Sequence, residues 1–391
     1  MEPCFETAPS YEDALARLMQ RAADRPQPSE PVPPTKAAGR ILAAPLTASA
    51  PRPPVALSAM DGFALCGASS EQPMNVAGTT HAGQACAILP PGAAWRVLTG
   101  APVPRGADRV VPQEYTRASG AHAITLTHVP ELGAHIRHRA EEYDGGAPLI
   151  PAGTHLDWRH IALCVAQGAP TLPVLRQPRI AIVSSGAELS SMPDSNAPML
   201  DALLRHAGAR VLPPVTLAGD DRADLARHIA ALVPQADIVV TTGGVSASET
   251  DHTPGALADL GATPLFRGVA LRPGRPATVA TLGDATIFAL PGNPLAAALC
   301  AVMLVRPFLR ALTAQPDDVR PGRLAFTPQT RAGTTTLHLV RTETDGARLT
   351  LHPVPTAGAS DISAITRADG VLAVSTRTAP ADGDVVAFLP L

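Results

Sequence analysis

An apolar run that opens straight into a pair of glycines places the strongest constraint on what this chain can fold into. The run Ile238-Val239-Val240 leads into Thr241-Thr242-Gly243-Gly244-Val245-Ser246, and Glu249 and Asp251 follow closely. Glycines let the backbone turn sharply and bring successive N–H groups close to phosphate oxygens. Acidic residues nearby suit a hard cation bound against those oxygens. The sequence therefore predicts an α/β fold with an anion site for a phosphorylated small molecule.

Apolar strands alternate with amphipathic helices after Pro178. Such alternation favours a doubly wound α/β domain, which is a parallel sheet with helices on both faces. Ligands bind at the carboxyl ends of the strands in these sheets, and three motif-like loops follow strands here, at 184–186, 241–246 and 291–294. The expected strands are 180–183, 210–212, 238–240 and 285–290, and the expected helices are 199–206, 222–232 and 295–312.

The 391 residues are too many for one compact core, so two to four domains are expected. Ser10 is placed to cap an N-terminal helix, and a helix over 158–167 is expected to pack beside it. Short strands broken by glycine and proline, such as 109–111 and 123–126, indicate β-rich regions. The predicted domains are a small discontinuous linker domain of 1–35 with 148–177, a β-rich domain of 36–147, the α/β domain of 178–316, and a small C-terminal β domain of 317–391.

Composition excludes several classes of function. A formal net charge of -3 and an aromatic content of 3% argue against nucleic-acid binding. No apolar run is expected to approach the length of a membrane span, and Met1-Glu2-Pro3 does not begin a secretory signal. Five scattered cysteines without a C-x-x-C pair indicate reduced thiols and a cytoplasmic protein. Because Lys36 is the only lysine, any oxyanion site must use guanidinium groups.

Several loops carry polar residues that, taken one by one, favour ordinary structural roles. Asp61 next to Gly62 is typical of a hairpin turn, and Thr99 begins a rigid proline-rich turn. Glu142 lies in a charged cluster that resembles a solvated face, and Asp221 precedes a helix as an N-cap would. Glu188 follows a strand end, where the positive end of a helix favours an acid.

Two loops point more directly to an anion. In Arg272-Pro273-Gly274-Arg275-Pro276 the Pro-Gly kink aims two guanidinium groups at one place, which a surface turn rarely needs. Pro291-Gly292-Asn293-Pro294 makes a tight turn from a strand into a helix, and the N-terminus of that helix can bind an anion.

Taken together and in this order, these loops resemble the MoeA/gephyrin-type molybdopterin molybdenumtransferases. The resemblance runs from about residue 10 to residue 312 and continues weakly beyond. Its most specific pieces are 58–62, 99–104, 242–246 with Asp251, 272–276 and 290–294.

The resemblance implies an enzyme that inserts molybdate into adenylylated molybdopterin and releases AMP, with Mg²⁺ or a similar divalent cation. It also implies an α/β domain of the molybdopterin-binding type, a C-terminal domain like a small β-barrel, and an elongated homodimer. In such dimers the active site lies between the α/β domain of one subunit and the β-rich domain of the other. Transient contacts with an adenylyltransferase and with acceptor molybdoenzymes are expected, and no contact with nucleic acid or membrane.

The resemblance also implies roles for individual residues. The family's catalytic positions correspond to Asp61, Thr99, Glu142, Glu188 and Asp251, and its metal ligands to Asp61, Glu188, Asp221 and Asp251. Its substrate- and anion-binding positions correspond to Gly243, Gly244, Ser246, Arg272, Arg275, Pro291, Gly292, Asn293 and Arg341.

The chain departs from the family pattern at several of these places. Arg272 and Arg275 stand where the family has lysines, and Glu142 stands where it has aspartate. Ala296 and Ala359 replace serines that are thought to line the molybdate pocket. The loss of these serines is expected to affect the affinity for molybdate rather than the binding of the pterin.

Two alternative functions stay open at this point. The α/β domain alone also resembles a molybdopterin adenylyltransferase, although the loop around Asp61 is foreign to that class of enzyme. A paralogue that binds the pterin as a carrier or scaffold is the other alternative, and Ala296 and Ala359 favour it.

Overall fold

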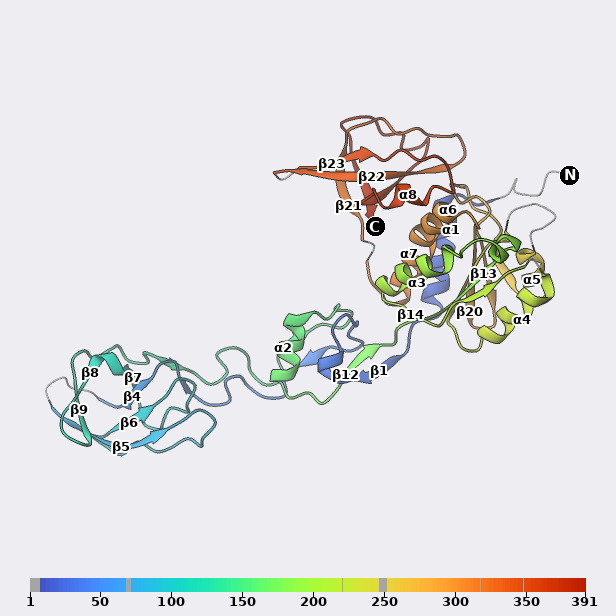
Figure 1. The fold of residues 1–391 in the computed structure, drawn as a ribbon. Helices are drawn as coiled ribbons and strands as arrows, with labels where there is room; N and C mark the ends of the chain where they lie inside the picture. Colours follow the sequence, from blue (N-terminus) through green and yellow to red (C-terminus); the bar gives the residue numbers. More distant parts are fainter. Residues whose placement is uncertain (1–7, 68–71, 220, 246–251, 317, 347) are drawn as a thin grey trace. The chain divides into compact units, whose positions relative to one another are not determined.

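The computed structural model describes residues 8–67, 72–219, 221–245, 252–316, 318–346 and 348–391 (Figure 1). The chain forms two compact units. The larger consists of Met1–Val32, Gly39–Ala43 and Pro173–Leu391, and the smaller consists of Pro33–Ala38 and Ala44–Leu172. The finer division into four domains stays a prediction.

A mixed β-sheet forms the centre of the larger unit. In the described residues it has seven strands, with the order β14-β13-β16-β20-β19-β17 and with β15 also paired to β13. The strands are β13 (Arg179–Ser185), β14 (Arg210–Val211), β15 (Val215–Leu217), β16 (Ile238–Thr242), β17 (Thr263–Phe266), β19 (Thr278–Leu282) and β20 (Ala285–Leu290). From β14 to β20 all pairs are parallel, as expected. However, β19 and β17 continue the sheet in antiparallel pairing, so the expectation of a wholly parallel sheet is wrong.

Helices cover both faces of this sheet, and alternate strand residues point to each face. Ile180 and Ile182 of β13 pack into one core with α1, α3, α6 and α7, whereas Ala181 and Val183 pack into the other with α4 and α5 (Figure 1). The doubly wound arrangement is confirmed. The helices are α1 (Tyr11–Ala23), α3 (Asn196–His206), α4 (Arg222–Leu232), α5 (Thr253–Asp259), α6 (Pro294–Cys300), α7 (Arg306–Leu312) and α8 (Ile362–Ile365).

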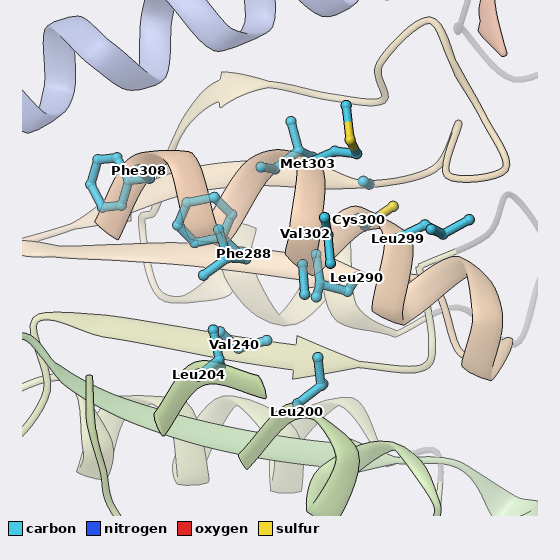
Figure 2. Close-up of a cluster of buried hydrophobic side chains, with 14 of the residues drawn as sticks. Leu200, Leu204, Val240, Phe288, Leu290, Leu299, Cys300, Val302, Met303 and Phe308 are labelled. Atoms are coloured by element: carbon cyan, nitrogen blue, oxygen red, sulfur yellow. The ribbon is translucent and has the colours of Figure 1, made fainter. Parts of the chain in front are cut away.

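The larger of the two cores is closed by one long apolar helical segment. Pro294–Leu312 runs through α6, a π-helical stretch at Ala301–Val305, and α7. Figure 2 shows Phe288 of the sheet beside Phe308 of this segment, with ring centres 5.5 Å apart. The segment is long and apolar enough to cross a membrane, contrary to what the composition suggested, but 83% of it is buried inside the protein. A helix that is apolar on all sides is expected in the core of a large domain.

The N-terminal helix belongs to the same core. The Oγ atom of Ser10 accepts a hydrogen bond from the backbone N–H of Asp13 at 3.1 Å, so the predicted cap is confirmed. Helix α1 packs against α7, and the hydroxyl of Tyr11 donates to the carbonyl of Met303 at 3.1 Å. Helix α1 thus belongs to the larger unit and the helix near residue 160 to the smaller one, and the expectation that they pack together stays a prediction.

The C-terminal part of the larger unit is a closed β-barrel. Its strand order is β18-β22-β23-β21-β25-β24, and an additional pairing of β22 with β24 closes the ring. Strand β18 comes from the Arg272–Pro276 loop and pairs in parallel with β22, so Arg272 lies opposite Thr336. The strands are β18 (Leu271–Arg272), β21 (Arg320–Leu324), β22 (Thr335–Asp345), β23 (Arg348–Pro353), β24 (Gly370–Val374) and β25 (Val385–Pro390).

The smaller unit is rich in β-strands, as predicted. Its largest sheet has the order β7-β4-β6-β5-β9-β8. These strands are β4 (Gly62–Leu65), β5 (Met74–Thr80), β6 (Ala94–Val97), β7 (Arg109–Pro112), β8 (Thr116–Ala118) and β9 (Ala123–Leu126). Short pairs join β3 (Leu57–Ser58) to β10 (Ile136–Arg137), and β2 (Leu46–Thr47) to β11 (Pro148–Ile150). Helix α2 of this unit is Trp158–Ala166. Strand β1 (Ser29–Val32) pairs with β12 (Leu172–Leu175), and all of these residues except Leu172 are assigned to the larger unit.

Asp237, at the start of β16, is the half-buried carboxylate that holds neighbouring strands in register. Arg176 donates two hydrogen bonds to it at 2.9 Å, and the backbone N–H of Arg179 donates a third at 2.7 Å. Burial opposes ionisation, but these hydrogen bonds outweigh it and lower the pKa of Asp237. The carboxylate therefore stabilises the fold above its unfolded pKa of about 3.9, and this contribution is lost as pH falls through the lower folded pKa.

We expect Asp237→Asn to lower the free energy of unfolding by about 2 kcal/mol at pH 7, because the variant leaves Arg176 half-buried without its counter-ion. Urea unfolding at pH 7 and near pH 3 measures this. The difference in unfolding free energy between the two proteins should narrow in acid, because protonation of Asp237 in the unfolded wild type reduces the contribution of the ionised carboxylate. An equal gap at both pH values would contradict the assignment.

Candidate functional site

A cavity of about 600 Å³ lies at the carboxyl ends of the parallel strands and is called cavity 1 here. In open α/β sheets, ligands bind at this edge, where the parallel strands end. Its walls come from the loops that follow β13, β16 and β20. Among the predicted site residues, the catalytic and metal-binding candidate Glu188 lines it, as do the substrate-binding candidates Gly243, Gly244, Pro291, Gly292 and Asn293.

The Gly-Gly turn is shaped by very close backbone contacts. Gly243 has a φ of +96°, and a Cβ atom there would lie 1.9 Å from the carbonyl oxygen of Ser185. A Cβ atom on Gly292 would lie 3.4 Å from the Cα atom of Gly243, so the two loops are almost in contact. The hydroxyl of Thr253, at the start of α5, donates to the carbonyl of Gly243 at 3.0 Å. Only glycine at position 243 fits between these groups.

Asn196 joins the loops around cavity 1, and the sequence analysis did not single it out. Its Nδ2 group donates to the Oγ1 atom of Thr242 at 2.9 Å and to the carbonyl of Gly292 at 2.7 Å. The sequence does contain a signal: Asn196, Leu200 and Leu204 are spaced four apart and all three are buried. An asparagine within the buried stripe of a helix needs polar partners.

Asp194 accepts hydrogen bonds at the N-terminus of the same helix, α3. Its Oδ1 atom accepts from the backbone N–H groups of Asn196 at 3.0 Å and Ala197 at 3.1 Å. Its Oδ2 atom accepts from the hydroxyl of Thr216 at 2.9 Å. Both oxygens of this carboxylate are therefore used within the protein, although Asp194 lines cavity 1.

Glu188 is the other acid of cavity 1. It lies in a short 3₁₀ helix, Ala187–Ser190, directly after β13. Its carboxylate folds back over Gly186, where a Cβ atom would meet both carboxylate oxygens within 2.5 Å. The missing side chain at position 186 leaves the space in which this acid reaches the cavity.

A second cavity, cavity 2, has about 730 Å³ and shares Pro276, Pro291 and Asn293 with the first. Its charged lining in the described residues is wholly basic, with Arg272, Arg275 and Arg331. Several alanines and glycines fill the rest of the wall, among them Ala296 and Ala359, the two positions where serines were expected. Guanidinium groups bind oxyanions through charge-assisted hydrogen bonds, so this lining suits an oxyanion.

The loop that carries two of these arginines is packed against the long buried helix. Gly274 has a φ of +126°, and a Cβ atom there would lie 2.5 Å from the Sγ atom of Cys300. Cys300 is fully buried, and burial raises the pKa of its thiol to about 12. The close approach of Gly274 to Cys300 therefore leaves no room for a side chain at the turn between Arg272 and Arg275.

Arg331, rather than Arg341, accompanies the basic loop. Strand β22 begins at Thr335 beside β18, so the residues just before the strand are close to Arg272. Arg341 lies five residues beyond Thr336 along the same strand, which is about 17 Å at the rise of a β-strand. It is exposed, pairs across the hairpin with His352, and lines neither cavity. The structure therefore places Arg331, and not Arg341, in the lining of cavity 2, and the anion-binding role of Arg341 stays a prediction.

Of the remaining predicted metal ligands in the larger unit, Asp221 is the one that the structure describes. Asp221 caps α4, and its Oδ1 atom accepts from the backbone N–H groups of Ala223 at 2.7 Å and Asp224 at 3.0 Å. It does not line cavity 1. Ser246 and Asp251 lie outside the described residues. Among the residues that are described, no group of three or more His, Cys, Asp or Glu side chains is placed to hold a metal ion.

In the smaller unit, Asp61 and Thr99 lie together. One oxygen of Asp61 accepts from both the backbone N–H and the hydroxyl of Thr99, each at 2.7 Å. These two hydrogen bonds, the backbone one first, lower the pKa of Asp61 and keep its exposed side chain ionised. The chain enters β4 directly after Asp61 through Gly62, where a Cβ atom would lie 2.1 Å from the carbonyl oxygen of Val111.

Glu142 forms ion pairs within the smaller unit. Arg137 donates a hydrogen bond to it, and the Nε atom of Arg52 donates another at 2.9 Å. The hydrogen bond from Arg137 is the main cause of the lowered pKa of Glu142. The structure thus shows a stabilising ion-pair network at this position, and a catalytic role for Glu142 stays a prediction.

We expect Thr99→Val to raise the pKa of Asp61, because the variant loses the hydroxyl donor and keeps the backbone one. The Asp61 carboxylate would then become protonated at higher pH than in the wild type. An NMR titration of the Asp61 carboxyl carbon measures the shift. Thr116→Val serves as a control, since the hydroxyl of Thr116 donates to a backbone carbonyl in the same unit. An unchanged pKa in Thr99→Val would show that the hydroxyl is unimportant.

Comparison with known families gives two matches along the chain. Residues 9–168 match the family described as MoeA N-terminal region (domain I and II). Residues 181–311 match the family described as probable molybdopterin binding domain. The two matches cover the smaller unit and the α/β part of the larger one.

Curated relatives and solved structures agree with these matches. The chain is 38% identical to a molybdopterin molybdenumtransferase of Nostoc, over 74% of this chain and 70% of the relative. It is 34% identical to molybdopterin molybdenumtransferase 2 of Mycobacterium tuberculosis, over 75% of this chain and 78% of the relative. A crystal structure of a molybdopterin biosynthesis MoeA protein from Pyrococcus has a TM-score of 0.79 and 24% identity, covering 98% of this chain and 99% of the other. The last comparison shows the fold alone.

Proposed function

The chain belongs to the MoeA family of molybdopterin molybdenumtransferases, and from this premise we propose that it inserts molybdate into adenylylated molybdopterin and releases AMP. The observation that carries the proposal is the pair of adjoining cavities in the larger unit, which share Pro276, Pro291 and Asn293. One is lined by acids, hydroxyls and a Gly-Gly turn, and the other by three arginines. An organic substrate and an oxyanion can therefore bind side by side.

Molybdate is the proposed occupant of cavity 2. It is a tetrahedral dianion, and charge-assisted hydrogen bonds from guanidinium groups suit it. Arg272, Arg275 and Arg331 supply these donors from two different loops. Alanine at positions 296 and 359 removes hydroxyl donors from the wall, so we propose that the arginines provide most of the affinity for molybdate.

Adenylylated molybdopterin is the proposed occupant of cavity 1. The backbone N–H groups of a Gly-Gly turn and of the loop before α6 suit its phosphate oxygens. Holding the two sulfurs of the substrate next to molybdate supplies proximity, which is a large part of such a reaction. No side chain needs to act as a nucleophile.

Mg²⁺ is the proposed cofactor. In phosphate sites Mg²⁺ is usually held by one or two carboxylates together with the oxygens of the substrate. The Glu188 carboxylate in cavity 1 fits this requirement, since it is the acid there whose oxygens are not used to cap α3. When bound, the cation would polarise the phosphoanhydride and stabilise the charge on departing AMP.

We also propose that the protein is a cytoplasmic homodimer that meets an adenylyltransferase and acceptor molybdoenzymes only transiently. The homodimer would allow the Asp61 and Thr99 pair to take part in catalysis, as the family resemblance implies. Light scattering of the purified protein in solution tests the dimer directly, and a monomer at micromolar concentration would argue against it.

The central test is AMP release. The purified protein is incubated with preformed adenylylated molybdopterin and Mg²⁺, with and without molybdate, and AMP is measured by chromatography. Release of AMP that depends on molybdate supports the proposal. Tight retention of the pterin without AMP would indicate a carrier, which Ala296 and Ala359 favour. Transfer of AMP from ATP onto molybdopterin would indicate an adenylyltransferase.

A further inference from the structure

We propose that His338 is a positioning residue for the oxyanion of cavity 2, because it anchors the segment of the chain that carries Arg331. This inference rests on the proposed function, in which cavity 2 binds molybdate. Arg331 lines that cavity and is exposed. A long, exposed arginine loses conformational freedom when it binds an anion, so a backbone that is fixed beforehand raises the affinity.

Arg331 lies between two backbone anchors in the segment 325–334, which joins β21 to β22. On its C-terminal side, the backbone N–H of Thr335 donates to the carbonyl of Ala270 at 2.8 Å, directly before β18. On its N-terminal side, the Nε2 atom of His338 lies 2.9 Å from the carbonyl oxygen of Gln329. The first anchor is a backbone hydrogen bond, whereas the second depends on a side chain. His338 is therefore the part of this arrangement that a substitution can remove.

The hydrogen bond from His338 to Gln329 uses the one donor of the imidazole. A carbonyl oxygen can only accept, so Nε2 carries the hydrogen. Burial lowers the pKa of His338, so the ring is neutral at pH 7 and has a single N–H group. The rings of Phe326 and His338 meet edge to face, with their centres 6.2 Å apart. The imidazole is therefore held with its donor toward the segment that carries Arg331.

Packing alone does not account for a histidine at this position. Side chains alternate along β22, so His338 shares a face with Val340, which belongs to the apolar core of the barrel together with Leu324. An aliphatic side chain would fill the same space, whereas a half-buried imidazole costs free energy unless its polar atoms are paired. Its partner is the carbonyl oxygen two residues before Arg331. The polar ring at position 338 is thus explained by the segment that it holds.

A double-mutant cycle with Arg331 tests the proposal. His338→Phe keeps a flat ring beside Phe326 and removes the donor, and the Kd of the full-length protein for molybdate is measured by equilibrium dialysis. His338→Phe should raise this Kd about fivefold, which is the size expected of one hydrogen bond. In the Arg331→Ala background the same substitution should leave the Kd unchanged, because His338 acts through the arginine that is missing. No effect in either background, or an equal effect in both, would overturn the proposal.

Three more variants separate positioning from a general effect on the barrel. His338→Gln keeps an amide donor at about the reach of Nε2 and should restore the wild-type affinity for molybdate. His338→Asn carries the same amide on a shorter side chain and should bind as weakly as His338→Phe, which it replaces in the cycle if that variant does not fold. His228→Phe is the matched control, because the ring of His228 also has a nitrogen 2.9 Å from a backbone carbonyl but lines neither cavity. Weak binding by folded His338→Gln or His228→Phe, or tight binding by folded His338→Asn, would contradict the proposal.

The AMP-release assay distinguishes this inference from the proposed function. His338→Phe should raise the KM for molybdate and leave the KM for adenylylated molybdopterin unchanged, since no described residue of the segment 325–334 lines cavity 1. Equal changes in both KM values, or no saturable binding of molybdate by the wild type, would overturn the inference. A wild type that binds molybdate and shows the coupling to Arg331, but releases no AMP, would contradict the proposed function alone.

Discussion

Arg272→Ala combined with Arg331→Ala is expected to lower the kcat/KM for molybdate by about 10³-fold, since each charge-assisted hydrogen bond contributes about 1.5–3 kcal/mol. One of the two arginines, Arg272, reaches cavity 2 from β18, and the other, Arg331, reaches it from the turn before β22. Arg275 alone would then face the dianion. The measurement is AMP release as a function of molybdate concentration. The KM for adenylylated molybdopterin should change much less, because cavity 1 contains no arginine in its described lining.

Two further variants make this test specific. Arg377→Ala removes an arginine from the turn after β24 and controls for the loss of positive charge alone. Arg341→Ala compares the arginine that the family resemblance favours with the one that the structure places beside the basic loop. Arg331→Ala should have the larger effect on the KM for molybdate. A larger effect of Arg341→Ala would support the anion-binding role that the family resemblance implies for Arg341.

Gly243→Ala is expected to cause the largest loss of stability of any single methyl addition in the α/β domain. The new Cβ atom would lie 1.9 Å from the carbonyl oxygen of Ser185, which is backbone and cannot move aside alone. The residue would also keep a φ of +96°, which disfavours any side chain. We expect a loss of about 4 kcal/mol or more, which lowers the melting temperature by roughly 10 °C in a domain of this size.

Two matched glycines separate the causes of this effect. Gly208 has a φ of +90° with nothing within 4 Å of its Cβ position, so Gly208→Ala measures backbone strain alone. Gly219 has open space and no positive φ, so Gly219→Ala measures neither strain nor a clash. The melting temperature is expected to be highest for Gly219→Ala, lower for Gly208→Ala and lowest for Gly243→Ala. Equal losses for the last two would mean that the contact with Ser185 is unimportant.

Strong local patterns made much of the α/β domain predictable. The strand expected at 285–290 is β20 with the same bounds, and the helix expected at 222–232 is α4 with the same bounds. Ser10 and Asp221 could be identified as helix caps because capping depends on residues only two or three positions away. An apolar helix was expected over 295–312, but its burial on all sides was not, because that depends on what packs around it.

Long-range pairing explains what the sequence did not reveal. The alternation of strands and helices does not show that β19 returns antiparallel beside β20. The partners of Asn196, Thr242 and Gly292, are 46 and 96 residues away. Arg331 reaches the basic loop only because β18 adds to the barrel beside β22, a pairing of two residues across more than sixty positions of chain. Such contacts depend on the tertiary fold and leave almost no local pattern.

The pairing of β18 with β22 also limits how far this protein can be divided into independent modules. A fragment that ends near residue 316 would retain both arginines of the basic loop and the described lining of cavity 1 except Ser360. The two-residue strand that carries Arg272 would have lost its neighbour, and the third guanidinium would be gone. Transplanting the α/β portion into another polypeptide would therefore transfer recognition of the organic substrate without secure capture of the metal oxyanion. Any natural or engineered fusion that is to retain both would have to include the barrel.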